Sequence, residues 1–79
     1  MTVRLFARAR DLAGADAVTV ELPAGATVAE LRTALAAACP TLAPLLPRSA
    51  VAVNEEFAGD SVRIPPGAEL ALLPPVSGG

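Results

Sequence analysis

The residues best suited to chemistry in this sequence are its last six, which read Pro74-Pro75-Val76-Ser77-Gly78-Gly79. Because glycine has no Cβ, a narrow slot in another protein could enclose this backbone and its terminal carboxylate. Such a carboxylate could be adenylated, converted to a thioacid or joined to an amine in a partner's active site. Fully extended, residues 75–79 reach roughly 17 Å beyond the domain. An ordinary frayed terminus is the alternative interpretation.

The other side chains offer little chemistry. The sequence has no His, Lys, Tyr or Trp, and all six basic residues are Arg. Without His there is no ready general base near neutral pH, no activating partner for a Ser or Cys nucleophile and no second soft ligand to join Cys39 at a metal. Glu55 and Glu56 are adjacent and point to opposite sides of a strand, which makes them a poor acid/base pair. We therefore expect no catalysis by this domain itself and no bound metal or cofactor.

Composition limits the class of protein. With 79 residues, of which 53% are hydrophobic, the chain is expected to form one small folded domain over residues 1–79. No apolar run approaches the roughly 18 residues of a membrane span, and no signal peptide is evident. A single cysteine makes the cytoplasm the default compartment. A net charge of −2 without a basic cluster argues against a nucleic-acid partner.

The first half of the chain predicts two strands and a helix. Period-2 alternation places one strand over Val3, Leu5 and Ala7 and another over Val18, Val20 and Leu22. A loop over residues 11–16 would join them as an antiparallel hairpin.

A helix is expected to begin at Thr27, where the residues Thr27 and Glu30 have the spacing of a capping box. Its core face would be formed by Val28, Leu31, Leu35 and Ala38. Pro40 disfavours helical geometry at the preceding residue, so the helix should end at Cys39. Cys39 is then most simply a packing residue at the helix end.

The second half predicts three more strands. After an irregular connection over 41–47, an apolar strand covers residues 50–53, an edge strand 55–57 and a last strand 69–73, with a turn at Pro65-Pro66-Gly67. One mixed sheet with a single main helix packed on one face is the α+β arrangement that this order favours.

Some apolar residues fall on the face of the sheet away from the helix. If Val3 and Leu5 face the core, then Phe6 faces the other way, flanked by Arg4 and Arg8. Alternation likewise turns Leu73 outward, and Phe57 could join the two. If the first and last strands are neighbours, these residues form an exposed docking patch beside the tail. Covering loops, or a register shifted by one residue, would remove the patch.

The sequence resembles that of the small subunit of molybdopterin synthase over essentially the whole chain. The similar segments are Phe6-Ala7, Arg10-Asp11-Leu12-Ala13-Gly14, Val53-Asn54-Glu55 and above all Leu73-Pro74-Pro75-Val76-Ser77-Gly78-Gly79. One departure is Gly67-Ala68-Glu69, where the family usually has Gly-Asp-Glu.

The resemblance implies a ubiquitin-like β-grasp fold with residues 74–79 as a protruding tail. It also implies that Gly79 is adenylated with ATP by a partner enzyme and then carries sulfur as a thiocarboxylate. The tail, Pro75, Val76, Ser77 and Gly78, would enter the large synthase subunit, which builds the dithiolene of molybdopterin from cyclic pyranopterin monophosphate. Phe6, Phe57 and Leu73 match positions that pack on the large subunit, and Arg10 matches a polar contact.

Three alternatives stay open at this point. A ubiquitin-like protein modifier would use the same activated glycine to acylate lysines of other proteins. A sulfur carrier for thiamine also ends in Gly-Gly, but generally lacks the Pro-Pro-Val approach. A plain β-grasp interaction module would not need its last residues at all.

Overall fold

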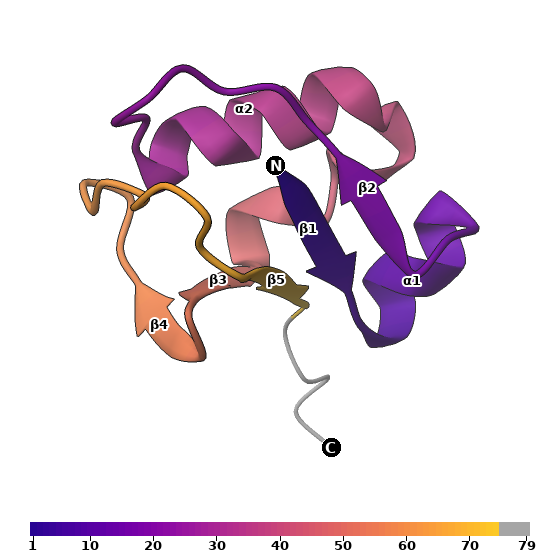
Figure 1. Ribbon diagram of the computed structural model, residues 1–79. Helices are drawn as coiled ribbons and strands as arrows, with labels where there is room; N and C mark the ends of the chain where they lie inside the picture. The colour runs from indigo at the N-terminus through magenta and orange to yellow at the C-terminus, as the bar shows by residue number, and fades with distance from the viewer. Residues whose placement is uncertain (75–79) are drawn as a thin grey trace.

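The computed structural model describes residues 1–74, which form a five-stranded sheet with helices on one side (Figure 1). The strands are β1 (Thr2–Leu5), β2 (Ala17–Thr19), β3 (Ala50–Val53), β4 (Glu56–Ala58) and β5 (Leu70–Leu73). The helices are α1 (Ala7–Ala13), α2 (Val28–Ala38) and the short 3-10 helices η1 (Pro40–Leu42) and η2 (Leu46–Arg48). No helix in this part of the chain is long and apolar enough to cross a membrane.

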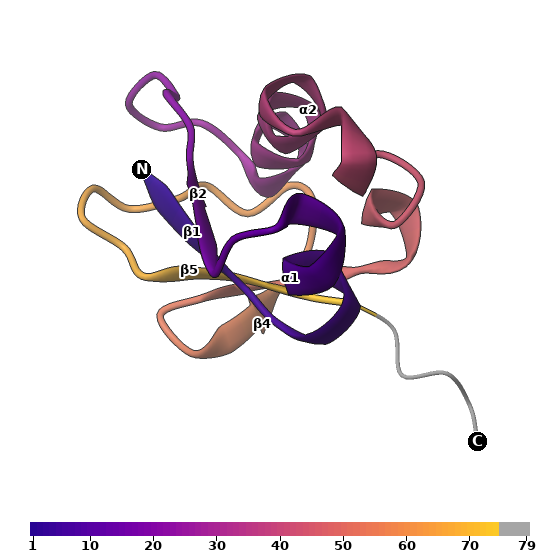
Figure 2. The same cartoon turned by 90° about the vertical axis from the view of Figure 1, so that its right-hand side faces the viewer.

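The sheet is mixed, with the strand order β2-β1-β5-β3-β4. The first and last strands lie side by side and parallel, with Val3 opposite Leu70 and Leu5 opposite Leu72. The other three pairings are antiparallel. Figure 2 shows α2 above the sheet and, within residues 1–74, no helix on the opposite side. This is the predicted ubiquitin-like β-grasp arrangement.

The core lies between the sheet and α2. Its largest fully buried side chains are Leu31, Leu35, Leu42, Ile64, Leu70, Leu72, Val3, Val28 and Val51. Every strand except the edge strands contributes to it by alternation, because successive side chains of a strand point to opposite faces. The predicted core face of α2 is confirmed at Val28, Leu31 and Leu35 and wrong at Ala38, which is exposed in the last turn.

The beginning of α2 is held by two sets of hydrogen bonds. The Thr27 hydroxyl accepts from the Glu30 amide and Glu30 Oε1 accepts from the Thr27 amide, each at 3.3 Å, which confirms the capping box. The next two amides, of Val28 and Ala29, donate to carbonyls of the 59–64 loop at 3.0 Å. These bonds satisfy donors that a helix N-terminus leaves without intrahelical partners. The helix ends with Cys39 as its cap before Pro40, as predicted.

The segment after β1 differs from the prediction. The strand stops at Leu5, and Ala7 begins the seven-residue helix α1 instead of continuing the alternation. Ala7 has a φ of 50°, which turns the chain out of the sheet. The loop predicted over 11–16 is therefore helical up to Ala13, and Gly14 ends α1 in the left-handed region at φ 70°. The antiparallel pairing of β1 with β2 is confirmed.

Asn54 and Glu55 form the tight turn between β3 and β4, with φ values of 51° and 69°. Such left-handed pairs are typical of two-residue hairpins and favour Asn followed by Gly. Glu55 thus occupies a position that suits glycine better. The predicted edge strand over 55–57 is confirmed at Glu56 and Phe57, whereas Glu55 belongs to the turn and the strand continues to Ala58.

Removing the helix cap should lower stability. We expect Thr27→Ala to reduce the free energy of unfolding by about 1 kcal/mol, because the Glu30 amide loses its acceptor. Urea denaturation measures the change. Thr33→Ala is the matched control, since Thr33 is exposed within the same helix and should tolerate Ala without loss. Equal losses in both variants would contradict this role of the cap.

The strained turn should be improved by glycine. We expect Glu55→Gly to raise the free energy of unfolding by about 0.5–1 kcal/mol, because the left-handed conformation costs glycine nothing. Glu56→Gly, one residue later in extended β4, should lower it by a similar amount. Thermal and urea unfolding of the two variants test the contrast. A loss of stability in Glu55→Gly would be inconsistent with strain at this turn.

Candidate functional site

The candidate site is the open face of the sheet, opposite α2, near the point where β5 ends. On the adjacent strands β3 and β5, valine and leucine side chains face the core, whereas Ala52 and Ala71 face the open side. These two alanines are direct cross-strand partners. Because a methyl group rises little above a sheet, larger side chains around it, such as Arg4 on β1 and Glu69 before β5, stand above this floor. The open face is therefore hollowed along its middle.

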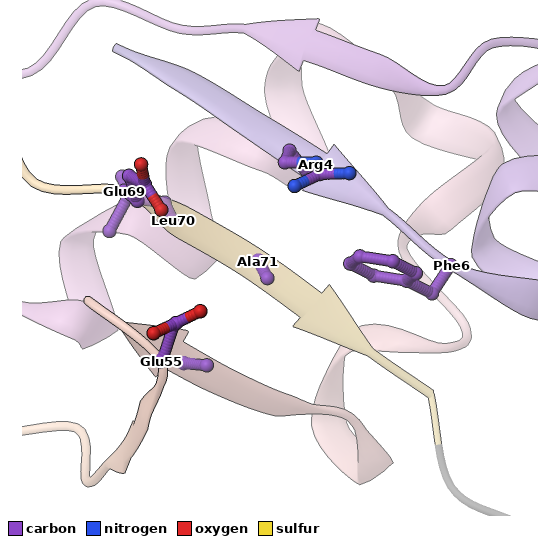
Figure 3. Close-up of a pocket in the computed structure, with 7 residues that line it drawn as sticks. Arg4, Phe6, Glu55, Glu69, Leu70 and Ala71 are labelled. Carbon is purple, nitrogen blue, oxygen red and sulfur yellow. The ribbon is translucent and has the colours of Figure 1, made fainter.

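The hollow is a shallow pocket of about 150 Å³, comparable with a cavity that admits a benzene ring. Its floor and walls include Ala52, Ala71, Arg4, Phe6, Glu55 and Glu69. Figure 3 shows the aromatic ring and the arginine on the β1 side and the two carboxylates toward the opposite end of β5 and the β3–β4 turn. An apolar floor with charged walls can accept a partner's apolar side chain and orient it by polar contacts.

Phe6 is 38% exposed and belongs to this pocket, as the alternation predicted. Leu5 is paired with Leu72, so the next residues of the two parallel strands, Phe6 and Leu73, follow side by side. Leu73 is half-buried at the end of β5 and leads directly to Pro74. The chain therefore leaves the sheet beside an exposed aromatic ring, which confirms the predicted neighbourhood of the first and last strands.

Phe57 is 76% exposed on edge strand β4. It lies opposite Ala52, so its side chain is on the open face too. Two strands, β3 and β5, separate β4 from β1, which places Phe57 roughly 14 Å across the sheet from the β1 side. Phe6 lines the hollow, whereas Phe57 lines a separate groove with Val62, so the two aromatic side chains lie on the same face without forming one continuous patch.

Arg10 lies in α1, and its Nε is 3.9 Å from Asp16 Oδ1. Both side chains are more than half exposed, so this ion pair adds little stability. Arg10 does not line the hollow. Its predicted role as a partner contact stays a prediction, and Arg8, expected beside Phe6 on the sheet, lies in α1 as well.

Two features of the site were not predicted from the sequence. Arg4 Cζ lies 5.5 Å from the centroid of the Phe6 ring. In addition, Asn54 holds the turn at the other end of the hollow. Its backbone amide donates to the Glu69 carbonyl at 2.8 Å, and its side-chain Oδ1 accepts from the Glu69 backbone amide at 2.9 Å. The period-2 spacing of Arg4 and Phe6 was the signal for the first feature, since it places both on one face.

The predicted tail residues Pro75, Val76, Ser77, Gly78 and Gly79 lie outside the described residues. Cys39, at the end of α2, is partly buried with its Sγ 3.2 Å from the Thr41 hydroxyl. Within residues 1–74, no group of three or more His, Cys, Asp or Glu side chains is placed to hold a metal ion.

Comparisons with known proteins agree with this architecture. The chain is 39% identical over 77 residues to the molybdopterin synthase sulfur carrier subunit of Arabidopsis thaliana, covering 98% of this chain and 80% of that protein. The crystal structure of SAMP1, small archaeal modifier protein 1, from Haloferax volcanii superimposes with a TM-score of 0.87 at 36% identity, covering 100% of this chain and 98% of that one. A putative molybdopterin converting factor subunit 1 from Pyrococcus furiosus gives 0.81 at 28% identity, covering 95% of each chain. The model of the ThiS family matches residues 3–79, and the chain belongs to this family.

Proposed function

We propose that this chain is the sulfur carrier subunit of a molybdopterin synthase. The observation that carries the proposal is the position of the C-terminal exit: β5 ends beside Phe6, at the rim of an exposed and partly apolar sheet face. A partner that packs on this face would receive the following segment in the same interface. The names of the full-length relatives favour molybdopterin over thiamine as the pathway.

In this role the chemistry takes place at Gly79. A carboxylate is a poor electrophile, so an adenylating partner enzyme uses ATP to supply a better leaving group. The carboxyl then receives sulfur and becomes a thiocarboxylate, whose sulfur is a stronger nucleophile than the oxygen it replaces. Each loaded chain donates one sulfur to cyclic pyranopterin monophosphate and is returned to its carboxylate by water, so two such transfers form the dithiolene of molybdopterin.

The domain itself serves as a carrier and supplies no catalytic side chain. Catalysis is left to the large subunit, because a chain without His has no ready general base near neutral pH. It must present the same C-terminus to two proteins, the large subunit and the adenylating enzyme. The two glycines suit this double use because they fit narrow active sites. We place this exchange in the cytoplasm.

The open face is the surface proposed to bind the large subunit. Phe6 and Phe57 offer exposed aromatic area on either side of the alanine floor, and aromatic residues are enriched at the centres of interfaces. Leu73 continues the apolar surface to the exit.

A second function is favoured by one comparison. SAMP1 is named a modifier protein, and it is similar over its whole length. A modifier would use the same activated glycine to acylate lysines of other proteins. Immunoblotting of cell extract for covalent adducts of this chain separates the two functions, because a sulfur carrier alone forms no amide adducts.

The terminal glycine should be required for function and dispensable for folding. We expect Gly79→Ala and deletion of Gly79 to abolish sulfur transfer in a reconstituted synthase assay, because the reactive carboxyl is displaced or obstructed in its slot. The thermal midpoint should stay unchanged, since the core is formed by residues 3–72. Normal pterin sulfuration by either variant would refute the mechanism.

Loss of the Phe6 ring should weaken docking. We expect Phe6→Ala to raise the dissociation constant for the large subunit roughly 10-fold, as truncation of a central aromatic residue does. Thr33→Ala is the control, because Thr33 is exposed on α2, which covers the other face of the sheet. Isothermal titration calorimetry measures both variants. Equal binding by Phe6→Ala and the wild-type chain would exclude this face as the interface.

A further inference from the structure

Arg4 and Phe6 make a contact whose role the proposed function leaves open. The distance of 5.5 Å between Arg4 Cζ and the Phe6 centroid is within the range in which a guanidinium is attracted to the face of an aromatic ring. Both side chains line the hollow. In Figure 3 the ring of Phe6 extends toward Ala71, with the Arg4 guanidinium beside it.

The Phe6 side chain lies on the open face, directly after the end of β1. The strand ends at Leu5, so Phe6 follows the last paired residue of β1, and Ala7 then turns the chain into α1. The ring stands on an open face and remains 38% exposed. A ring in this position, without further restraint, would sample several rotamers, and binding would have to select one of them at a cost in free energy.

Arg4, in contrast, is well placed to restrain the ring. Its backbone is fixed between two strands, opposite Ala71 of β5 and Ala17 of β2. Glu55 and Glu69 line the same hollow, yet neither carboxylate forms an ion pair with Arg4. Within residues 1–74, the Arg4 guanidinium forms no ion pair and lies by the ring of Phe6.

We propose that Arg4 is a positioning residue of the docking face, whose guanidinium holds the Phe6 ring over the alanine floor in the orientation that the partner binds. The inference rests on the proposed function, because the partner is taken to be the large synthase subunit. Arg4 contributes to affinity through Phe6, by lowering the cost of ordering the ring, and not through a contact of its own with the partner.

A double-mutant cycle tests this proposal. The dissociation constant for the large subunit is measured by calorimetry with the full-length chain, as wild type, Arg4→Met, Phe6→Leu and the double variant. We expect Arg4→Met to weaken binding about 3- to 30-fold, the range of a cation–π contact. In the Phe6→Leu background the same change should have no effect, because no ring remains to be positioned.

Two further variants sharpen the test. Arg4→Lys keeps the charge but loses the planar group, so its affinity should fall between those of wild type and Arg4→Met. Arg8→Met is the matched control: the Arg8 side chain is exposed on α1, and the variant should bind like wild type. In the free chain, nuclear magnetic resonance should show ring-current shifts on the Arg4 side-chain protons that vanish in Phe6→Leu.

The outcomes separate this inference from the proposed function. Wild-type affinity in Arg4→Met, or an undiminished effect of Arg4→Met in the Phe6→Leu background, would overturn the positioning role while leaving the sulfur carrier intact. The second result would show that Arg4 contacts the partner directly. A wild-type chain that fails to bind the large subunit would refute the proposed function, and the positioning role with it.

Discussion

The parallel pairing of β1 with β5 is the constraint on which the site depends. It joins the first and last strands in the middle of the sheet, with Leu5 held opposite Leu72. Because both strands run in the same direction, they end at the same edge, where Phe6 and Leu73 follow. The position of the C-terminal exit is thus fixed by the core, since the paired Val3, Leu5, Leu70 and Leu72 are all buried.

The same strands pack against α2 with one face and form the proposed docking face with the other. On β3 and β5 the fully buried valine and leucine side chains face α2, whereas Ala52 and Ala71 face outward. Small residues on the open side reduce the apolar area left in water and at the same time create the hollow. The charged side chains of Arg4, Glu55 and Glu69 surround it. Glu55 is retained in a left-handed turn conformation that favours glycine, which is typical of strain kept near a functional surface.

Much of the fold could be predicted from local sequence patterns, because most elements carry strong signals of their own. The capping box and Pro40 fixed the limits of α2. Alternation identified β1, β2 and β5, although β2 ends at Thr19 and not at Leu22 as predicted, and an apolar run identified β3. Helix α1 was missed because Ala7 continues the alternation of β1, although Ala9, Leu12 and Ala13 have helical spacing and Gly14 a helix-ending conformation. The neighbourhood of Phe6 and Leu73 followed from a correct choice of strand pairing. The proposed restraint of Phe6 by Arg4 could not be predicted in this way, because it depends on side-chain conformation.

The central claim is that the terminal carboxyl is the reactive group and the folded domain its carrier. Intact-mass spectrometry of the chain isolated from its native cell, under conditions of active molybdopterin synthesis, tests it most directly. We expect a population in which one oxygen of the C-terminal carboxyl is replaced by sulfur, located to Gly79 by fragmentation. A C-terminus found only as the plain carboxylate, with the sulfur carried elsewhere on the chain or absent, would contradict it.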